Sequence, residues 1–355
     1  MEATMRAARF YKAGEPLTIE KLPIPKIGAG EVLIKVKACG ICGTDVHIAR
    51  DGTIPPAKTP ITLGHEIAGE IAEIGEGVEG WKIGDKVLVI SSITCGACYA
   101  CRSGREALCV NAQILGLHVD GGLADYLKIP KNCLTKIPEG VPFEQAAIIG
   151  DAVATPYHAI ITRGNLRLGE TVAIFGCGGL GSHAIQIAKL AGASKIIAID
   201  VSDEILERSK MLGADFTINS AREKTGKRIS EITGGKGVDL ALEFVGMATT
   251  IDRAVKSIRK GGRAVIVGIG PEKIELVSPY IFVYCEDQVM GSFGSNKEEI
   301  DRILELIKMK KLDLSRSISQ VLKLEQVNEG LERLEKKVGN PISCLLYTSP
   351  SPRDS

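Results

Sequence analysis

An apolar stretch that runs directly into a glycine-rich turn constrains the fold of this chain more than any other feature. Thr171–Phe175 is a continuous apolar run, as in a strand buried within a parallel sheet, and the hexapeptide Gly176-Cys177-Gly178-Gly179-Leu180-Gly181 follows it at once. Apolar residues at helical spacing then continue to Gly192, and a second apolar strand over 195–199 ends in Asp200. This order of strand, glycine turn, helix and strand predicts a βαβ unit of a parallel sheet.

The glycine turn predicts a dinucleotide-binding site, whose candidate residues are Gly176, Gly178, Gly179, Leu180 and Gly181. Glycines permit a tight turn and let backbone N–H groups approach a pyrophosphate at the helix N-terminus. Asp200, which follows after about 20 residues, would accept hydrogen bonds from the adenosine ribose and repel a 2′-phosphate, so NAD is favoured over NADP. The alternative is a structural glycine turn in an unrelated parallel sheet.

Strand and helix patterns alternate through the rest of this region. The further predicted strands are 216–218, 238–244, 264–267 and 288–292, and the predicted helices are 202–212 and 248–258. Together with the first βαβ unit they predict an α/β fold, a doubly wound parallel sheet of Rossmann type over residues 151–293. Two more helices are expected after it, one over 297–309 and one carrying Val327, Leu331 and Leu334.

The first part of the chain has a different texture. Short strand-like runs broken by proline and glycine occupy residues 6–40, 67–90 and 123–137, which predicts a β-rich domain. The length of 355 residues also fits two domains better than one. Asp85, in a glycine-containing stretch of this part, is interpreted as a turn residue.

Residues 39–66 gather candidate metal ligands and proton-carrying side chains. An alternating strand over 31–38 delivers the hexapeptide Cys42-Gly43-Thr44-Asp45-Val46-His47 at its end, and Gly64-His65-Glu66 follows. A thiolate and an imidazole suit zinc, and a catalytic zinc site needs three protein ligands with one position open. Cys42 and His65 would supply two of the three. Taken singly, a cysteine at a strand end and a histidine in a loop are ordinary residues.

A second group of thiols has the spacing of a structural metal site. Its members are Cys95, Cys98, Cys101 and Cys109. Four thiolates at these intervals can close a tetrahedron around one zinc and leave no position open for substrate. The alternatives are four unrelated buried cysteines, or a redox Cys-x-x-Cys pair, although redox chemistry needs only two thiols.

Composition excludes several classes of partner. The net charge is +1 with acids and bases interspersed, which favours neither nucleic acid nor an anionic membrane surface. Residues 1–10 lack the apolar core of a signal peptide, and no apolar run reaches the roughly 18 residues of a membrane helix. We therefore expect a soluble cytoplasmic protein, in which cysteines clustered between 95 and 109 indicate metal binding rather than disulfides.

With the two metal clusters and the nucleotide turn established, the chain resembles the zinc-dependent medium-chain alcohol dehydrogenases over about residues 5–341. The resemblance implies a chaperonin-10-like catalytic domain formed by 1–150 and 294–343, an NAD-binding Rossmann domain over 151–293, and an active site in the cleft between them. It also implies a homodimer or homotetramer. The implied reaction is hydride transfer between NAD and a secondary, cyclic, polyol or hydroxyacyl alcohol, which gives an aldehyde or ketone.

The same resemblance assigns roles around the catalytic zinc. Cys42 and His65 are implied ligands, Glu66 is a nearby acid that can bind the metal when no substrate is present, and Asp45 orients His65. The position of the third ligand falls on Asp151, for which a helix N-cap is the alternative reading. The competing cysteines are Cys39, Cys133, Cys177 and Cys285.

Proton transfer and cofactor contacts are implied in the same way. Thr44 and His47 resemble the family's proton relay, although Thr44 could instead cap a helix and His47 could be a surface residue. The residues implied to lie beside the nicotinamide are Thr155, Val245, Val267, Gly268 and Ile269. The candidates for lining the substrate pocket are Ile48, Ile54, Leu117 and His118, whereas His158 and His183, like His118, belong to no ligand pattern.

Two departures from the family pattern bear on the expectations. Ile205 occupies the place, five residues after Asp200, where relatives often have a basic residue, and the nearest arginine is Arg208. Residues 344–355 end in a Ser/Pro-rich sequence, so we expect a non-native or disordered tail there and a missing last strand. Two other functions remain open: a quinone or enone reductase of the same fold without zinc chemistry, and a non-catalytic NAD-binding sensor.

Overall fold

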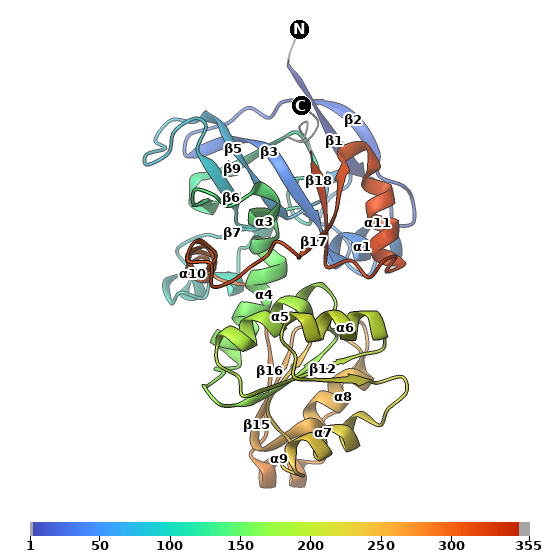
Figure 1. The fold of residues 1–355 in the computed structure, drawn as a ribbon. Helices are drawn as coiled ribbons and strands as arrows, with labels where there is room; N and C mark the ends of the chain where they lie inside the picture. Colours follow the sequence, from blue (N-terminus) through green and yellow to red (C-terminus); the bar gives the residue numbers. More distant parts are fainter. Residues whose placement is uncertain (1–2, 348–355) are drawn as a thin grey trace. The chain divides into compact units, whose positions relative to one another are not determined.

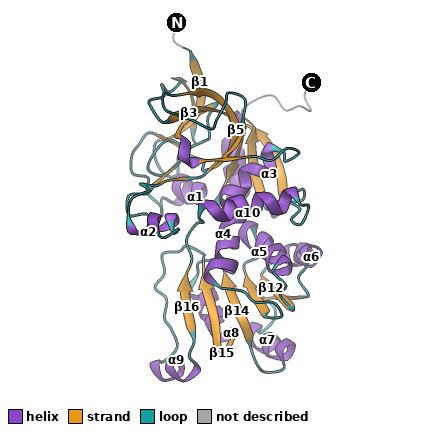
Figure 2. Ribbon diagram, turned by 90° about the vertical axis from the view of Figure 1, so that its left-hand side faces the viewer, coloured by secondary structure: helices purple, strands orange, loops and turns teal. Residues whose placement is uncertain are grey.

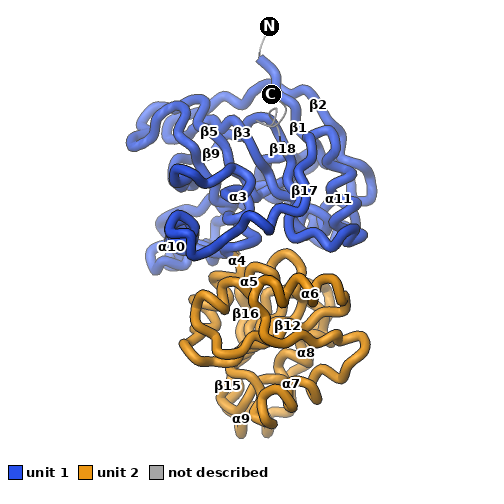
Figure 3. The backbone as a smooth tube through the Cα atoms, viewed as in Figure 1, with its two compact units in different colours: residues 1–154, 295–355 blue, residues 155–294 orange. Residues whose placement is uncertain are grey.

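The chain builds one folded unit, leaves it to build a second, and then returns to the first. The structure is a computed structural model that describes residues 3–347. Within that range, residues 3–154 and 295–347 form unit 1, and residues 155–294 form unit 2 (Figure 3). Within the described range no helix is long and apolar enough to cross a membrane.

Unit 1 is organised around a mostly antiparallel sheet (Figure 1). Its strands are β3 (Glu31–Ile41), β5 (Glu66–Ile74), β6 (Lys86–Val89), β9 (Tyr126–Pro130), β10 (Leu134–Lys136), β17 (Ile318–Lys323) and β18 (Ser343–Tyr347). Two smaller sheets pair β1 (Thr4–Phe10) with β2 (Thr18–Pro23) and β4 (Ile61–Thr62), and β7 (Ser92–Ile93) with β8 (Gln113–Ile114). The helices of this unit are α1 (Gly43–Val46), α2 (Tyr99–Arg102), α3 (Phe143–Ile148), α10 (Lys297–Lys308) and α11 (Val327–Glu335).

Strand β3 lies at the centre of this sheet and leads to Cys42. Its alternating residues Val32, Ile34 and Val36 are fully buried, whereas Lys35 is exposed, as the sequence pattern predicted. Strands β5, β9 and β18 all pair with β3. A strand paired on both edges is held along its length, so β3 provides a rigid base for the residues that follow it.

The end of the chain corrects one expectation. Residues 344–347 belong to β18, which runs antiparallel to β3 and parallel to β17, with Cys344 opposite Ile41. Cys344, Leu345 and Leu346 are buried, and this burial explains why the segment is ordered as a strand despite the Ser/Pro-rich sequence beyond it. The expectation of a missing last strand was therefore wrong, and residues 348–355 lie outside the described range.

Unit 2 is a parallel sheet with helices on both faces (Figure 2). The strand order is β13-β12-β11-β14-β15-β16, and the strands are β11 (Thr171–Phe175), β12 (Lys195–Asp200), β13 (Phe216–Asn219), β14 (Val238–Glu243), β15 (Ile258–Ile266) and β16 (Gln288–Gly291). The helices are α5 (Gly179–Leu190), α6 (Asp203–Leu212), α7 (Thr225–Thr233), α8 (Ala248–Ser257) and α9 (Pro279–Cys285). This order reverses direction between β11 and β14, which confirms the predicted doubly wound sheet.

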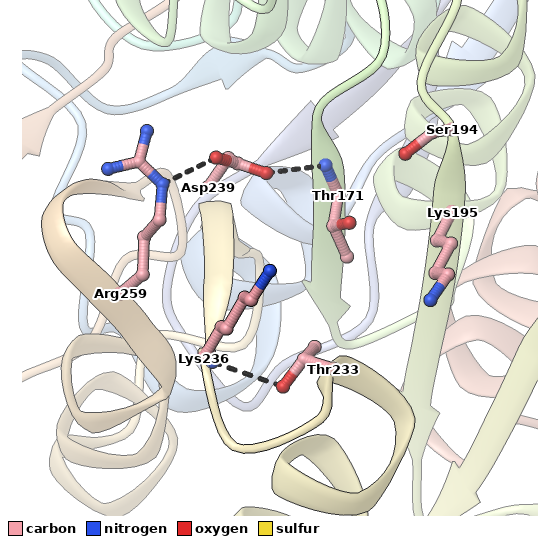
Figure 4. Close-up of a pocket in the computed structure, with 8 residues that line it drawn as sticks. Thr171, Ser194, Lys195, Thr233, Lys236, Asp239 and Arg259 are labelled. Carbon is pink, nitrogen blue, oxygen red and sulfur yellow. Dashed lines mark hydrogen bonds and ion pairs between the residues drawn. The ribbon is translucent and has the colours of Figure 1, made fainter.

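A polar hollow of about 390 Å³ lies at the amino ends of β11, β12 and β14 (Figure 4). There the Asp239 carboxylate accepts hydrogen bonds from the N–H of Thr171 (2.8 Å) and from Nε of Arg259 (2.6 Å). Lys195 donates to the carbonyl of Ile232 (3.3 Å), in the last turn of α7, where a cation is favoured by the helix dipole. These contacts stabilise the sheet at the edge opposite the glycine turn.

Candidate active site

Cys42 is placed by the end of β3 and by the short helix that follows. It forms the N-cap of α1, and its N–H donates to Oδ2 of Asp45 (2.9 Å). The other carboxylate oxygen of the fully buried Asp45 accepts the N–H of Gly64 (3.0 Å), the residue before His65. Asp45 therefore ties together the two segments that carry Cys42 and His65.

The direct contact between Asp45 and His65 is weaker than expected. His65 Nδ1 lies 3.8 Å from Asp45 Oδ1, which is beyond hydrogen-bond distance. Asp45 therefore orients the backbone before His65 more than the imidazole itself.

Three predicted ligands converge in unit 1. The Cys42 sulfur, a ring nitrogen of His65 and a carboxylate oxygen of Asp151 all lie within 4.8 Å of one another. The Cys42 thiol is 3.2 Å from Asp151 Oδ2, and His65 Nε2 is 3.5 Å from the same oxygen. Zinc bonds of about 2.0–2.3 Å at tetrahedral angles would place such donors roughly 3.4–3.6 Å apart. The arrangement therefore fits a zinc ion with three protein ligands and a fourth position open.

The charges of this cluster also fit a cation. Burial, and then the nearby Asp151 carboxylate, raise the pKa of the Cys42 thiol to about 12 and that of Glu66 to about 8. Burial alone would lower the pKa of His65, but the carboxylates of Asp45 and Asp151 hold it well above its ordinary value. A divalent cation among the donors would favour the thiolate and carboxylate forms that these residues otherwise resist.

Asp151 is not a helix N-cap. It lies inside a π-helical turn, Ile149–Val153, which continues directly from α3, so its N–H and carbonyl belong to the helical segment. Glu66 does not join the three donors; its Oε1 accepts the N–H of Ala152 (3.1 Å), the residue after Asp151. Glu66 thus supports the turn that carries Asp151.

The competing cysteines are not members of this ligand group. Cys39, Cys133 and Cys177 are buried, and Cys177 lies in the nucleotide turn of unit 2. Cys285, also in unit 2, is half-buried at the end of α9. Within residues 3–347, none of these four cysteines lies in a group of three or more side chains that could hold a metal.

The predicted proton carriers lie just after Cys42. Thr44 is inside α1 rather than at its cap, and its hydroxyl is 3.8 Å from the Cys42 sulfur. His47 is about half exposed, and its Nδ1 is 2.8 Å from Oδ2 of Asp51. An ionised Asp51 favours a proton on Nδ1 and leaves Nε2 free to accept one. Sequence reasoning missed Asp51, for which an acid four residues after a helical histidine was the available signal.

The four-cysteine group has the expected geometry. The sulfurs of Cys95, Cys98, Cys101 and Cys109 all lie within 4.8 Å of one another. Two pairs, Cys98–Cys101 and Cys95–Cys109, are 3.5 Å apart, close to the roughly 3.8 Å of a tetrahedral zinc site. Hydrogen bonds from the N–H groups of Cys101 and Val110 lower the pKa of Cys98 to about 6, which favours the thiolate that zinc binds.

The glycine turn in unit 2 brings the end of β11 close to the start of α5. Gly176 has a φ of +82°, and a Cβ on Gly181 would lie 2.0 Å from the carbonyl oxygen of Gly176, so strand and helix meet closely there. A Cβ on Gly178 would meet nothing within 4 Å. Gly178 is the N-cap of the twelve-residue helix α5, with Gly179, Leu180 and Gly181 in its first turn. The turn therefore offers open backbone N–H groups at a helix N-terminus.

Asp200 lies beside this turn. Its Oδ2 accepts the N–H of Cys177 (2.8 Å), and its Oδ1 accepts the N–H groups of Val201 (2.7 Å) and Ser202 (3.1 Å). A carboxylate has about four acceptor positions, so capacity remains for a ribose hydroxyl. Arg208, one turn beyond the buried Ile205 on α6, donates to the carbonyl of Cys177 (3.3 Å). Arg208 thus stabilises the glycine turn through its backbone, a role that sequence reasoning did not assign.

The residues predicted beside the nicotinamide lie on two loops and one helix. Val245 follows β14, and Val267, Gly268 and Ile269 follow β15, so both loops emerge at the carboxyl edge of the sheet. Gly176 lies against the first loop, since a Cβ there would be 2.6 Å from Cγ2 of Val245. Thr155 is buried on α4 (Ala154–Tyr157).

The remaining candidates are mostly core residues. Ile48 is fully buried in the hydrophobic core of unit 1, and Ile54 and Leu117 pack against that core. His118 accepts the N–H of Ile114 through Nδ1 (3.1 Å). The other two histidines, His158 and His183, are buried in unit 2.

Known proteins are similar to this chain in both sequence and fold. A family model described as "Alcohol dehydrogenase GroES-like domain" matches residues 28–139, and one described as "Zinc-binding dehydrogenase" matches residues 179–309. A sorbitol dehydrogenase of Bacillus subtilis is 37% identical over 348 residues, which cover 97% of each chain. An NAD-dependent alcohol dehydrogenase of Sulfurisphaera tokodaii is 36% identical over 349 residues, covering 95% of this chain and 99% of that one.

The crystal structure of the alcohol dehydrogenase of Aeropyrum pernix has the same fold. Its TM-score is 0.86 at 34% identity, and the match covers 97% of this chain and all of that one. The likeness therefore extends over both units and includes the segments that carry the two candidate zinc sites and the glycine turn. On sequence, fold and the descriptions of both matching models, the chain belongs to the zinc-dependent medium-chain alcohol dehydrogenase family.

Proposed function

We propose that this protein oxidises an alcohol to an aldehyde or ketone, or reduces the carbonyl compound, with NAD as the hydride carrier and zinc at its catalytic centre. The observation that carries the proposal is the convergence of donor atoms from Cys42, His65 and Asp151 within 4.8 Å. Such a set leaves one position open for substrate. When bound, zinc would act as a Lewis acid that lowers the pKa of a coordinated alcohol.

The residues around the centre would orient the ligands and move the proton. Asp45 holds the segments of Cys42 and His65 through hydrogen bonds to two backbone N–H groups. The Thr44 hydroxyl, 3.8 Å from the Cys42 sulfur, would pass the alcohol proton on. His47, oriented by Asp51, would release it to water. Glu66 would reach the metal only when no substrate is present.

Unit 2 would bind the cofactor. Bound NAD supplies the nicotinamide carbon that accepts the hydride. The open N–H groups of the glycine turn would hold the pyrophosphate, and Asp200 would accept hydrogen bonds from the adenosine ribose. The carboxylate charge of Asp200 supports a preference for NAD over NADP. Val245, Thr155 and residues 267–269 would lie beside the nicotinamide.

A second zinc is proposed for the four-cysteine group. The short distances between the four sulfurs support a closed structural site. None of the ten cysteines, all within residues 3–347, is in a disulfide, which supports a reducing, cytoplasmic location.

A homodimer or homotetramer is proposed for the assembly. Helix α9 in unit 2 buries none of its residues, and its Tyr280 and Val283 side chains are 73% and 74% exposed. Exposed apolar side chains of this kind are typical of an interface.

The substrate class is a secondary, cyclic, polyol or hydroxyacyl alcohol. Relatives named sorbitol dehydrogenase and L-threonine 3-dehydrogenase, 37% and 36% identical, support a secondary alcohol, since both sorbitol and threonine carry secondary hydroxyl groups. The alternatives are a quinone or enone reductase without zinc chemistry and a non-catalytic NAD-binding sensor. Neither needs the triad of donors that this chain assembles.

A substrate panel tests the proposal. NADH and NADPH formation would be followed with primary, secondary, cyclic and polyhydroxy alcohols and with hydroxyacyl-CoA esters, with and without a zinc chelator. Chelator-sensitive NADH formation is expected with at least one class. If the protein binds NADH but no alcohol is oxidised, the reductase and sensor alternatives gain support.

A further inference from the structure

Glu243 is a buried acid for which the proposed reaction has no role. It is the last residue of β14 and has no exposed surface. Its Oε1 accepts the N–H groups of Val245 (2.9 Å) and Gly246 (3.0 Å) and the hydroxyl of Thr250 (2.7 Å). Its Oε2 accepts the N–H of Gly246 as well (3.2 Å). The carboxylate thus fixes the loop that leaves β14.

The backbone of the same residue fixes a second loop. The carbonyl oxygen of Glu243 accepts the N–H groups of Val267 (2.8 Å) and Gly268 (3.0 Å), which leave β15. One residue therefore holds both loops, through its side chain on one and its main chain on the other.

The two loops are in direct backbone contact. A Cβ on Gly268 would lie 2.1 Å from the nitrogen of Gly246, and a Cβ on Gly246 would lie 2.5 Å from the carbonyl oxygen of Ile269. With so little space between them, a shift of the first loop must displace the second. Val245 and Ile269 are nevertheless 40% and 58% exposed, so the pair of loops presents apolar side chains outward on a rigid base.

Burying a carboxylate at this place is costly and calls for a specific reason. Burial raises the pKa of Glu243, and the hydrogen bonds from Thr250, Gly246 and Val245 oppose that shift. A buried acid that exchanges water for several directed hydrogen bonds rigidifies the groups it contacts. Here those groups are the backbone of the residues predicted beside the nicotinamide.

We propose that Glu243 is a positioning residue for the nicotinamide half of the cofactor, because it holds together the loops that carry Val245 and residues 267–269. The inference rests on the proposed NAD function. The inference concerns the nicotinamide end of the cofactor alone, because the glycine turn and Asp200 are proposed to bind the pyrophosphate and the adenosine ribose.

Ligand affinity for the two halves of the cofactor tests the proposal. The dissociation constants of NADH and of ADP-ribose, which lacks the nicotinamide, would be measured for the full chain and for Glu243→Ala. The NADH constant should rise about 10- to 100-fold, the effect expected when several hydrogen bonds to a charged group that hold a binding loop are lost. The ADP-ribose constant should stay within about twofold, which is the margin for an undisturbed site.

Two milder variants keep the test decisive if Glu243→Ala does not fold. Glu243→Gln retains an oxygen that can accept the Val245 and Gly246 N–H groups and should recover most of the NADH affinity. Thr250→Val removes one donor but leaves the carboxylate, and should weaken NADH about 3- to 10-fold, as expected for one hydrogen bond to a charged group. Both should leave ADP-ribose binding unchanged.

Asp239 provides a matched control. It lies at the other end of β14 and also accepts a backbone N–H, that of Thr171, so Asp239→Ala disturbs the same strand away from the loops. The ratio of NADH affinity to ADP-ribose affinity should be the same in Asp239→Ala as in the unaltered chain. Equal weakening of both ligands in Glu243→Ala and Thr250→Val, or no weakening of NADH binding in these two variants, would overturn the inference. An unaltered chain that fails to bind NADH would instead overturn the proposed function itself.

Discussion

Asp151 is the ligand candidate whose position depends most on the folded structure. It joins Cys42 and His65 from a π-helical turn that lies more than a hundred residues after Cys42 in the sequence. Asp151→Asn replaces a carboxylate with a weak amide ligand of the same shape. Zinc affinity and turnover should fall by about 100-fold or more. Loss of a residue that only supports a metal ligand already costs about 10–100-fold, and loss of the ligand itself should cost at least as much. Metal analysis and kinetics would measure both.

Asp85→Asn is the control for this prediction. Asp85 is also an aspartate of unit 1 and is buried, but it accepts the N–H of Lys82 (3.1 Å) in a turn, and within residues 3–347 it belongs to no ligand group. Its zinc content should be unchanged. Full zinc occupancy and turnover in Asp151→Asn would remove Asp151 from the ligands.

Asp200 governs the second residue-scale prediction. Asp200→Ala should lower the preference for NAD over NADP by about tenfold or more, since it removes hydrogen bonds to the ribose and a repulsive charge. Alanine also removes the acceptor for the N–H of Cys177, so Asp200→Asn serves as a companion that keeps an acceptor and removes only the charge. Steady-state kinetics with both cofactors would give the ratio. An unaltered ratio in both variants would contradict the ribose assignment.

At the residue scale, the chemistry of a side chain decided what the sequence could reveal. Clustered cysteine and histidine side chains most often bind metals. The occurrence of Cys42 and His65 in nearby motifs, and the spacing of the four-cysteine group, were therefore informative. A lone acid such as Glu243 or Asp51 has no such spacing. The partners of Glu243 include Val267 and Gly268, more than twenty residues away, and only the folded chain brings them together.

Among the secondary-structure elements of unit 2, Asp239 links β14 to β11 and β15 through hydrogen bonds from Thr171 and Arg259 (Figure 4). Burial would raise its pKa, but the hydrogen bonds from Thr171 and Arg259 outweigh burial and lower it. A depressed folded pKa stabilises the protein at pH values above the unfolded pKa, and this stabilisation is lost as the pH falls through the folded pKa.

The charge of Asp239 should therefore matter near neutral pH and not in acid. Asp239→Asn should lower the free energy of unfolding by about 1 kcal/mol at pH 7, with the difference shrinking below about pH 4. Denaturant unfolding at several pH values would measure it. Asp252, in an exposed pair with Lys256 on α8, is the control, and its asparagine variant should show no such difference. A pH-independent loss in Asp239→Asn would show that the ion pair is not its cause.

The elements themselves were predictable where burial leaves a pattern. The strands of unit 2 and helices α6, α8 and α10 fall within a few residues of their predicted bounds, apart from an earlier start of β15, and α11 contains the three residues predicted for it. Helix α9 was missed because none of its residues is buried, so it carries no apolar periodicity. β18 was missed because the Ser/Pro-rich ending obscured three buried residues next to it.

At the scale of the whole molecule, local patterns could not predict which segments share a unit. Residues 295–347 return to unit 1, where β17 and β18 join the sheet of β3, and α10 lies near the turn of Asp151. This return came only from the family resemblance, because strand partners far apart in sequence leave no local signal. The metal centre thus depends on a unit that the chain completes only with its last described strand.

Zinc content measured together with NADH formation tests the central claim most directly. The purified full-length protein should contain two zinc ions per chain and form NADH from an alcohol. A chelator that removes the more labile zinc should abolish this activity, and added zinc should restore it, because only the catalytic site has an open position. One zinc per chain with undiminished NADH formation, or activity that survives loss of the labile metal, would contradict a catalytic role for the centre formed by Cys42, His65 and Asp151.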